Sequence, residues 1–161
     1  MLKPYPVIEM TWKGWQELHP DALVLSDETG FDRPYNTDPL NIYRTPDNPE
    51  LFWPMPVSID RRRLPKERVL GIPDNFDGKS YPLEELDERS PARVVHDTLA
   101  GRPLVVFYKR SQDAALAFWT DGADAGRQFE AQEDRIVDAA TGSEWNVEGL
   151  ATAGALAGTR L

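Results

Sequence analysis

The chain has 161 residues, 27 of them acidic and 18 basic, which gives a formal net charge of -9. A chain of this length buries one hydrophobic core, so we expect about one domain. The negative charge repels nucleic-acid phosphates and anionic lipid, and no apolar run approaches the roughly 20 residues that cross a bilayer. Neither nucleic-acid binding nor membrane insertion is therefore expected. With no cysteine, the chain has no thiol chemistry of its own.

The first predicted element is a short N-terminal helix. Trp12 and Trp15 recur at near-helical spacing, Thr11 is suited to cap the helix N-terminus, and Pro20 disfavours helical backbone at the residue before it. We therefore expect the helix to end near residue 19. Both tryptophans are expected on one helical face, packed in the same core as Trp145.

A short strand and a long loop are predicted next. The apolar residues 23–25 favour a strand, which completes a helix-strand head over residues 1–25. Residues 26–64 contain six prolines and show no hydrophobic period. This segment nevertheless carries apolar surface that disordered segments lack, so we expect a long ordered loop. Its aromatic residues are Phe31, Tyr35, Tyr43, Phe52 and Trp53.

Residues 65–161 predict a body of antiparallel hairpins. Short apolar stretches alternate with turn residues, a pattern that favours a sheet rolled into a small barrel or sandwich. The fold class expected is therefore mainly β, a β-rich α+β fold with one short N-terminal helix. The predicted strands are 69–72, 79–82, 94–97, 103–108, 114–119, 129–131, 135–137, 144–147 and 156–161, with one helical turn at 83–87. We expect the head, the loop and the body to form a single domain over residues 1–161.

Several short motifs occur in a fairly specific order and spacing. The head carries Thr11-Trp12, Trp15 and His19-Pro20-Asp21, and the body carries Val94-Val95-His96-Asp97-Thr98 followed by Gly101-Arg102-Pro103. The tail carries Thr141-Gly142-Ser143-Glu144-Trp145 and a glycine-rich end. In the order tail then head, these motifs resemble the DUF3179 family, a group of tandem-repeat proteins of unknown function. The chain is similar to the end of the first repeat plus most of the second, cysteine-free repeat.

The resemblance implies where family chemistry is missing and how the ends meet. The family's first repeat has a Cys-Pro-Leu-Cys-Gly element where this chain reads Lys109-Arg110-Ser111-Gln112, so any thiol chemistry is absent from this chain. The order of the motifs implies that the head packs against a tail, which belongs either to the same chain or to a second copy. A monomer is favoured because packing within one chain avoids the entropy of association, and a swapped homodimer is the alternative. No targeting segment is recognised, because Pro4, Pro6 and Glu9 interrupt the N-terminal apolar residues. The resemblance points to an extracytoplasmic parent protein.

Five residues are the candidates for a polar or binding site. His19 lies beside Asp21, and a carboxylate that close orients an imidazole, although a helix-ending histidine more often bonds terminal carbonyls. His96 and Asp97 lie on opposite faces of a predicted strand, where a polar structural role is favoured over catalysis. Trp53, in the proline-rich loop, is the tryptophan best suited to contact a partner.

None of these residues forms a recognisable catalytic constellation or metal motif, and no cofactor is expected. We therefore interpret the chain as a non-catalytic structural or binding module whose ligand the sequence does not identify. The alternative is the scaffold half of a metal or redox accessory protein, or of an enzyme, whose chemistry resides in a cysteine-bearing repeat absent from this chain.

Overall fold

The computed structural model describes residues 7–48, 50–52, 62–73, 78–88 and 90–161. The chain divides into two compact units. The first consists of Met1–Asp21 and Val69–Leu161, and the second is Ala22–Arg68. A single domain over residues 1–161 stays a prediction, and each unit has its own internal contacts.

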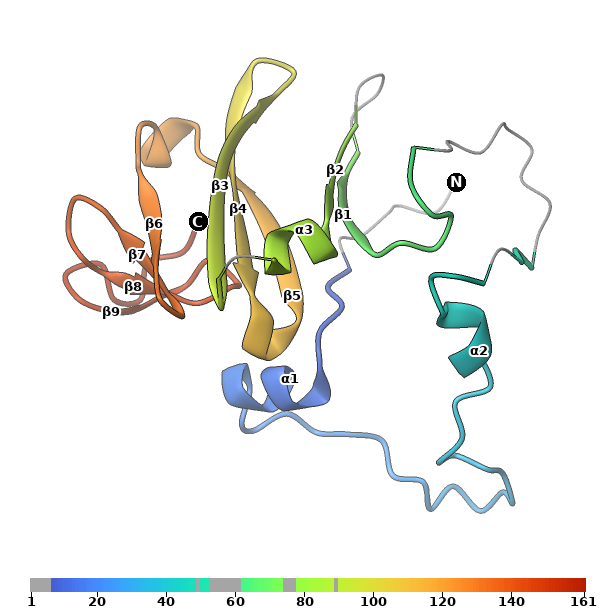
Figure 1. The fold of residues 1–161 in the computed structure, drawn as a ribbon. Helices are drawn as coiled ribbons and strands as arrows, with labels where there is room; N and C mark the ends of the chain where they lie inside the picture. Colours follow the sequence, from blue (N-terminus) through green and yellow to red (C-terminus); the bar gives the residue numbers. More distant parts are fainter. Residues whose placement is uncertain (1–6, 49, 53–61, 74–77, 89) are drawn as a thin grey trace. The chain divides into compact units, whose positions relative to one another are not determined.

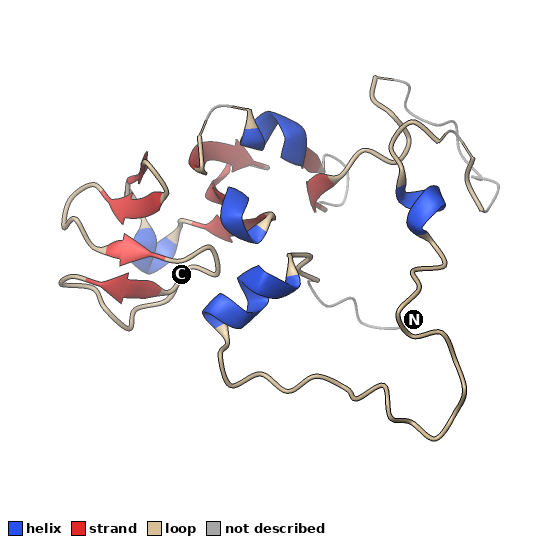
Figure 2. Cartoon of the chain, turned by 60° about the horizontal axis from the view of Figure 1, so that its bottom comes forward, coloured by secondary structure: helices blue, strands red, loops and turns tan. Residues whose placement is uncertain are grey.

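The first unit is mainly β and antiparallel, as predicted (Figure 2). Its three sheets have the strand orders β1-β2, β3-β4-β5 and β6-β7-β8-β9, and these pairings close no barrel in the described part of the chain. The helices of this unit are short. The strands are β1 (Val69–Ile72), β2 (Lys79–Pro82), β3 (Ala92–Leu99), β4 (Arg102–Lys109), β5 (Ala114–Trp119), β6 (Phe129–Gln132), β7 (Arg135–Asp138), β8 (Glu144–Trp145) and β9 (Ala151–Ala153); the helices are α1 (Trp12–Leu18), α3 (Leu83–Asp87), η1 (Arg110–Gln112) and η2 (Gly122–Asp124).

The three-stranded sheet lies between the four-stranded sheet and the β1-β2 hairpin (Figure 1). Each of its two faces packs in a hydrophobic core. Side chains of β4 alternate between its two faces, as the period of two in a strand requires. Val105 and Phe107 pack toward the four-stranded sheet, where they meet Trp145. Leu104 and Val106 pack on the other face, in the core that includes the β1-β2 hairpin and α3. β4 is therefore buried on both sides, and the first unit is built in sandwich-like layers.

Turn chemistry explains the long central hairpin. The register pairs Leu99 with Arg102, which leaves a two-residue connection between β3 and β4. Ala100 and Gly101 both have positive φ, 50° and 77°. A turn with two left-handed residues matches the right-handed twist of the flanking strands, so it favours this register.

Helix α1 docks on the body of the same unit. The Thr11 side chain accepts a hydrogen bond from the Gly14 N–H at 3.1 Å, which caps the helix as predicted. The Thr11 N–H donates to the Gln112 carbonyl at 2.9 Å, and Met10 and Leu18 pack against the core that contains Trp145. The predicted face was wrong for Trp12, which is 49% exposed. The side of the helix that carries Gly14 faces the body instead, because only a glycine allows the backbones to come this close.

The second unit contains one short helix, α2 (Asn41–Arg44), in its described part. The rings of Tyr43 and Phe52 stack with their centroids 3.9 Å apart, and the Lys66 ammonium lies 3.8 Å from the Tyr43 centroid. The strand predicted at residues 23–25 was wrong, because this segment forms no strand and has no pairing partner. Leu23 and Leu25 are almost fully exposed.

Most predicted elements of the body are confirmed, including the strands at 69–72, 79–82 and 114–119 and the helical turn at 83–87. The tail differs from the prediction. β8 ends at Trp145, and the predicted strand at 156–161 is reduced to a single bridge between Leu150 and Arg160. Glycines with positive φ interrupt the tail at Gly149, Gly154 and Gly158, so the backbone turns too often for a longer strand. No helix in the described ranges is long and apolar enough to span a membrane.

Candidate functional site

His19 joins the end of α1 to the tail of the chain. Its ring lies against that of Trp15, with 4.2 Å between the centroids. Nε2 of His19 lies 2.8 Å from Oε1 of Glu148, and both side chains are at least partly buried. The carboxylate at this imidazole is therefore Glu148, while Asp21 lies exposed in the turn that follows the helix. This contact ties the head to the body.

His96 bridges two sheets. Its Nε2 lies 3.0 Å from the carbonyl oxygen of Phe129 and 3.2 Å from the Phe129 backbone nitrogen. Phe129 begins β6, an edge strand of the four-stranded sheet, and the N–H and C=O of this residue face away from β7. The imidazole thus satisfies one of two main-chain groups that β7 does not pair with.

Asp97 points to the opposite face from His96, as predicted for a regular strand. It accepts hydrogen bonds from the Lys79 ammonium at 2.6 Å, the Tyr81 hydroxyl at 2.7 Å and the Thr98 N–H at 2.7 Å. In that order, these three bonds lower the pKa of Asp97 to about 2. Burial, together with the bond to Asp97, raises the pKa of Tyr81. The ionised carboxylate of Asp97, which accepts three hydrogen bonds, and the protonated hydroxyl of Tyr81 are suited to holding β2 on β3. They are not suited to proton transfer near neutral pH.

The structure does not bring the sequence candidates together. His19, His96 and Asp97 each contact a different partner element. Trp53 lies outside the described residues. Within the described ranges, no three histidine or acidic side chains gather as metal ligands would.

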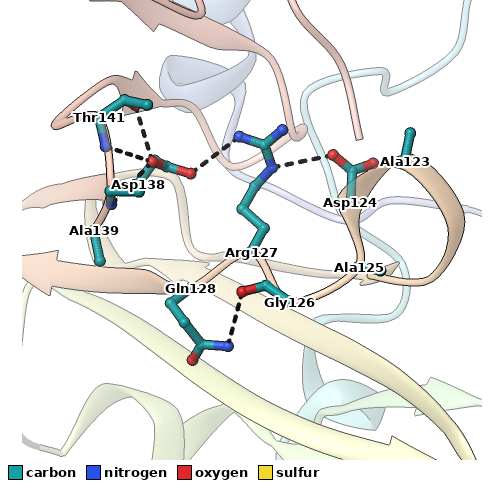
Figure 3. A pocket seen from close by; sticks show the side chains of 10 residues that line it. Ala123, Asp124, Ala125, Gly126, Arg127, Gln128, Asp138, Ala139 and Thr141 are labelled. Atoms are coloured by element: carbon teal, nitrogen blue, oxygen red, sulfur yellow. Dashed lines mark hydrogen bonds and ion pairs between the residues drawn. The ribbon is translucent and has the colours of Figure 1, made fainter.

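A different place, at one end of the four-stranded sheet, forms a pocket (Figure 3). The loop from η2 to β6 makes one side, and the turn between β7 and β8 makes the other. The pocket is shallow and open to solvent, with a volume of about 510 Å³. Small residues form much of the wall, so the backbone is accessible. The lining residues are Ala123, Asp124, Ala125, Gly126, Arg127, Gln128, Asp138, Ala139, Ala140 and Thr141.

Asp138 anchors the turn side of the pocket. It is 1% exposed. Its Oδ1 accepts hydrogen bonds from the Thr141 N–H at 2.8 Å, the Thr141 hydroxyl at 2.9 Å and the Ala140 N–H at 3.1 Å. Burial raises the pKa of Asp138, but the hydrogen bonds from Thr141 and Arg127 outweigh it, and the pKa lies below its ordinary value. The ionised carboxylate therefore fixes both the turn and the arginine beside it.

Arg127 lies between two carboxylates at the centre of the pocket (Figure 3). Nε donates to Oδ1 of Asp124 at 3.1 Å, and Nη1 donates to Oδ2 of Asp138 at 3.0 Å. The side chain remains 20% exposed. A guanidinium has five N–H donors, and these bonds use two of them. Nη2 has no hydrogen-bond partner among the described residues.

The sequence predicted no site at these pocket residues. The signals that predict it are local. Asp138 stands three positions before Thr141-Gly142, a pattern typical of a turn that the aspartate side chain closes by hydrogen bonds. Asp124 stands three positions before Arg127. Such patterns are common in loops, so they indicate the two halves of the pocket but not that the halves meet.

The comparisons with known proteins give one result. A family model described as "Protein of unknown function (DUF3179)" matches residues 1–161. No curated protein and no solved structure matches the chain. The resemblance noted in the sequence is confirmed at the level of the family, while the repeat assignment stays an expectation. Because the match covers its whole length, the chain belongs to the DUF3179 family.

Proposed function

We propose that the chain is a non-catalytic binding module whose ligand enters the pocket around Arg127. One observation carries this proposal. The guanidinium of Arg127 lines an open pocket of about 510 Å³, is held in place by Asp124 and Asp138, and keeps N–H donors that these two bonds do not use. An arginine fixed at two of its nitrogens loses little side-chain entropy when a further acceptor binds, so it is prepared for recognition.

The other candidate side chains already form hydrogen bonds within the fold, and this supports the non-catalytic part of the proposal. A general base needs access to the proton that it abstracts, but the Nε2 atoms of His19 and His96 already face partners within the fold. Ser143 is fully buried, its hydroxyl accepts a hydrogen bond from the Leu156 N–H, and its oxygen lies 2.9 Å from the Thr141 hydroxyl oxygen. These contacts suit side chains that hold the fold and leave ligand contact to the pocket.

A screen by nuclear magnetic resonance tests the proposal. Small neutral, anionic and cationic compounds are added to the ¹⁵N-labelled chain, and the backbone amide shifts of Gly126, Ala139 and Thr141 are followed. We expect hits that move these amides. Hits that map elsewhere, or an absence of hits, would contradict the proposal.

Two variants make the screen decisive. Ala140→Phe places a large side chain at an exposed position of the pocket wall and leaves the bonds of Arg127 and Asp138 in place. Ala155→Phe makes the same change at an exposed position outside the pocket lining. Binding should be lost in Ala140→Phe and kept in Ala155→Phe. Equal binding to both variants would place the ligand elsewhere.

A further inference from the structure

The charge of the pocket restricts the kind of ligand that it accepts. Arg127 contributes one positive charge, and Asp124 and Asp138 contribute two negative charges within hydrogen-bonding distance of it. One negative charge is therefore in excess. An anionic ligand that reached the guanidinium would approach both carboxylates, while a cationic ligand would meet the guanidinium itself. A neutral, polar ligand avoids both repulsions.

The hydrogen-bonding groups restrict the ligand further. Nη2 of Arg127 offers N–H donors, because the bonds of the guanidinium use Nε and Nη1. Within the part of the chain that the structure describes, the side chain of Asp124 bonds through Oδ1 alone, so its Oδ2 offers an acceptor beside the guanidinium. A complementary ligand presents one acceptor and one donor side by side. A primary carboxamide does so, since its oxygen and one of its N–H groups lie on the same side of a planar group.

The walls are consistent with a small planar group. Alanine and glycine make up half of the lining residues, and none of the lining side chains is aromatic. Trp145, whose ring centroid lies 5.6 Å from the Arg127 Cζ, is 3% exposed, so it offers no face on which a sugar ring could stack. Small walls instead allow a flat group to approach the edge of the guanidinium.

We infer that the pocket recognises a neutral primary carboxamide, with its oxygen on Nη2 of Arg127 and its N–H on Oδ2 of Asp124. This inference rests on the proposed function, because it names the ligand class for the same pocket. The carboxamide belongs either to a glutamine or asparagine side chain of a peptide or to a free small molecule.

Isosteric probes test the inference. N-acetylglutamine methylamide and N-acetylglutamate methylamide differ at one group, which is neutral in the first and anionic in the second. Dissociation constants are measured from the amide shifts of Gly126, Ala139 and Thr141. The glutamine probe should bind at least about tenfold more tightly than the glutamate probe. Propionamide identifies the source: equal binding points to a free carboxamide, and weaker binding points to a peptide side chain.

Asp124→Asn provides an internal check, because Asp124 is partly exposed and the substitution removes the excess negative charge. The preference for the glutamine probe should shrink in this variant. Equal or tighter binding of the glutamate probe to the unchanged chain would overturn the carboxamide assignment and leave the binding module standing. If neither probe binds but other screened compounds move the same amides, the assignment also fails alone. If no compound moves them, the proposed function fails as well.

Discussion

At the scale of single residues, several polar side chains in the described part of the chain connect segments that are distant in sequence. His96 is the clearest case, because its ring nitrogen faces both the N–H and the C=O of Phe129. A protonated Nε2 donates to the carbonyl, and an unprotonated one accepts from the N–H, so either tautomer leaves one bond in place. The sequence indicated a polar structural role here, but it did not indicate the partner, which lies 33 positions away.

The substitution His96→Ala tests this connection. It leaves the Phe129 main-chain groups at a sheet edge without their partner, so we expect a loss of about 1 to 3 kcal/mol in the free energy of unfolding, measured in urea. The control is Glu130→Ala, at an exposed position of β6 beside Phe129. A loss below about 0.5 kcal/mol for His96→Ala would mean that water satisfies Phe129 as well as the imidazole does.

At the scale of elements, the sequence was most informative where turn chemistry and alternation agree. The β3-β4 hairpin has a glycine-containing two-residue turn and alternating apolar faces, and both features are local. The orientation of α1 was not predictable in this way. A helix of seven residues has little periodicity, and its contact face depends on the close approach of Gly14 to Gln112, which no local pattern records. Residues 23–25 failed as a strand for the same reason, since a strand needs a partner.

The substitution Gly14→Ala tests the docking of α1. A Cβ at this position would lie 2.7 Å from the Gln112 Cα and 2.8 Å from its Cβ. Alanine favours an isolated helix by about 1 kcal/mol over glycine, but the clash forces the helix away from the body. We expect a net loss of about 1 to 3 kcal/mol in the free energy of unfolding.

Lys13→Ala, at an exposed position of the same helix, is the matched control and should change stability by less than about 0.5 kcal/mol. If Gly14→Ala stabilises the chain, the close packing of Gly14 against Gln112 of η1 is contradicted. Protection of the Thr11 amide from hydrogen exchange gives a second measure, because this N–H donates to the Gln112 carbonyl only in the docked helix.

At the scale of the whole molecule, the sequence predicted the mainly antiparallel β class but not the site. The fold class follows from many short strands separated by turn residues, a signal that repeats along the chain. The pocket joins the η2-β6 loop to the β7-β8 turn through one arginine and its two carboxylates. Such a contact depends on the register of β6 with β7, and single-sequence patterns do not fix how loops meet in space.

Acid stability is a property of the whole first unit. The pKa values of Asp87, Asp97 and Asp138 all lie below their ordinary value. A lowered pKa in the folded state stabilises the fold above the unfolded pKa, about 3.9, and this contribution is lost as the pH falls through the folded pKa. For Asp97 that window extends down to about pH 2. We expect the free energy of unfolding to fall between about pH 4 and pH 2.

Asp97→Asn isolates one part of this effect. The variant should be less stable than the unchanged chain at neutral pH and should lose less stability on acidification, as measured by urea unfolding at a series of pH values. Asp21→Asn, at an exposed turn position, should follow the unchanged chain. A pH profile of Asp97→Asn parallel to that of the unchanged chain would show that the Lys79 and Tyr81 bonds to Asp97 contribute nothing to acid stability.

The most direct test of the binding-module account is to locate a bound ligand against the alanine methyl groups of the pocket. Ala123, Ala125, Ala139 and Ala140 line both of its sides, so intermolecular nuclear Overhauser effects from the tightest-binding compound of the screen to these methyls place the ligand without any substitution. The account predicts effects to methyls on both sides of the pocket. Effects confined to methyls elsewhere, such as the exposed Leu23 and Val24, would contradict it.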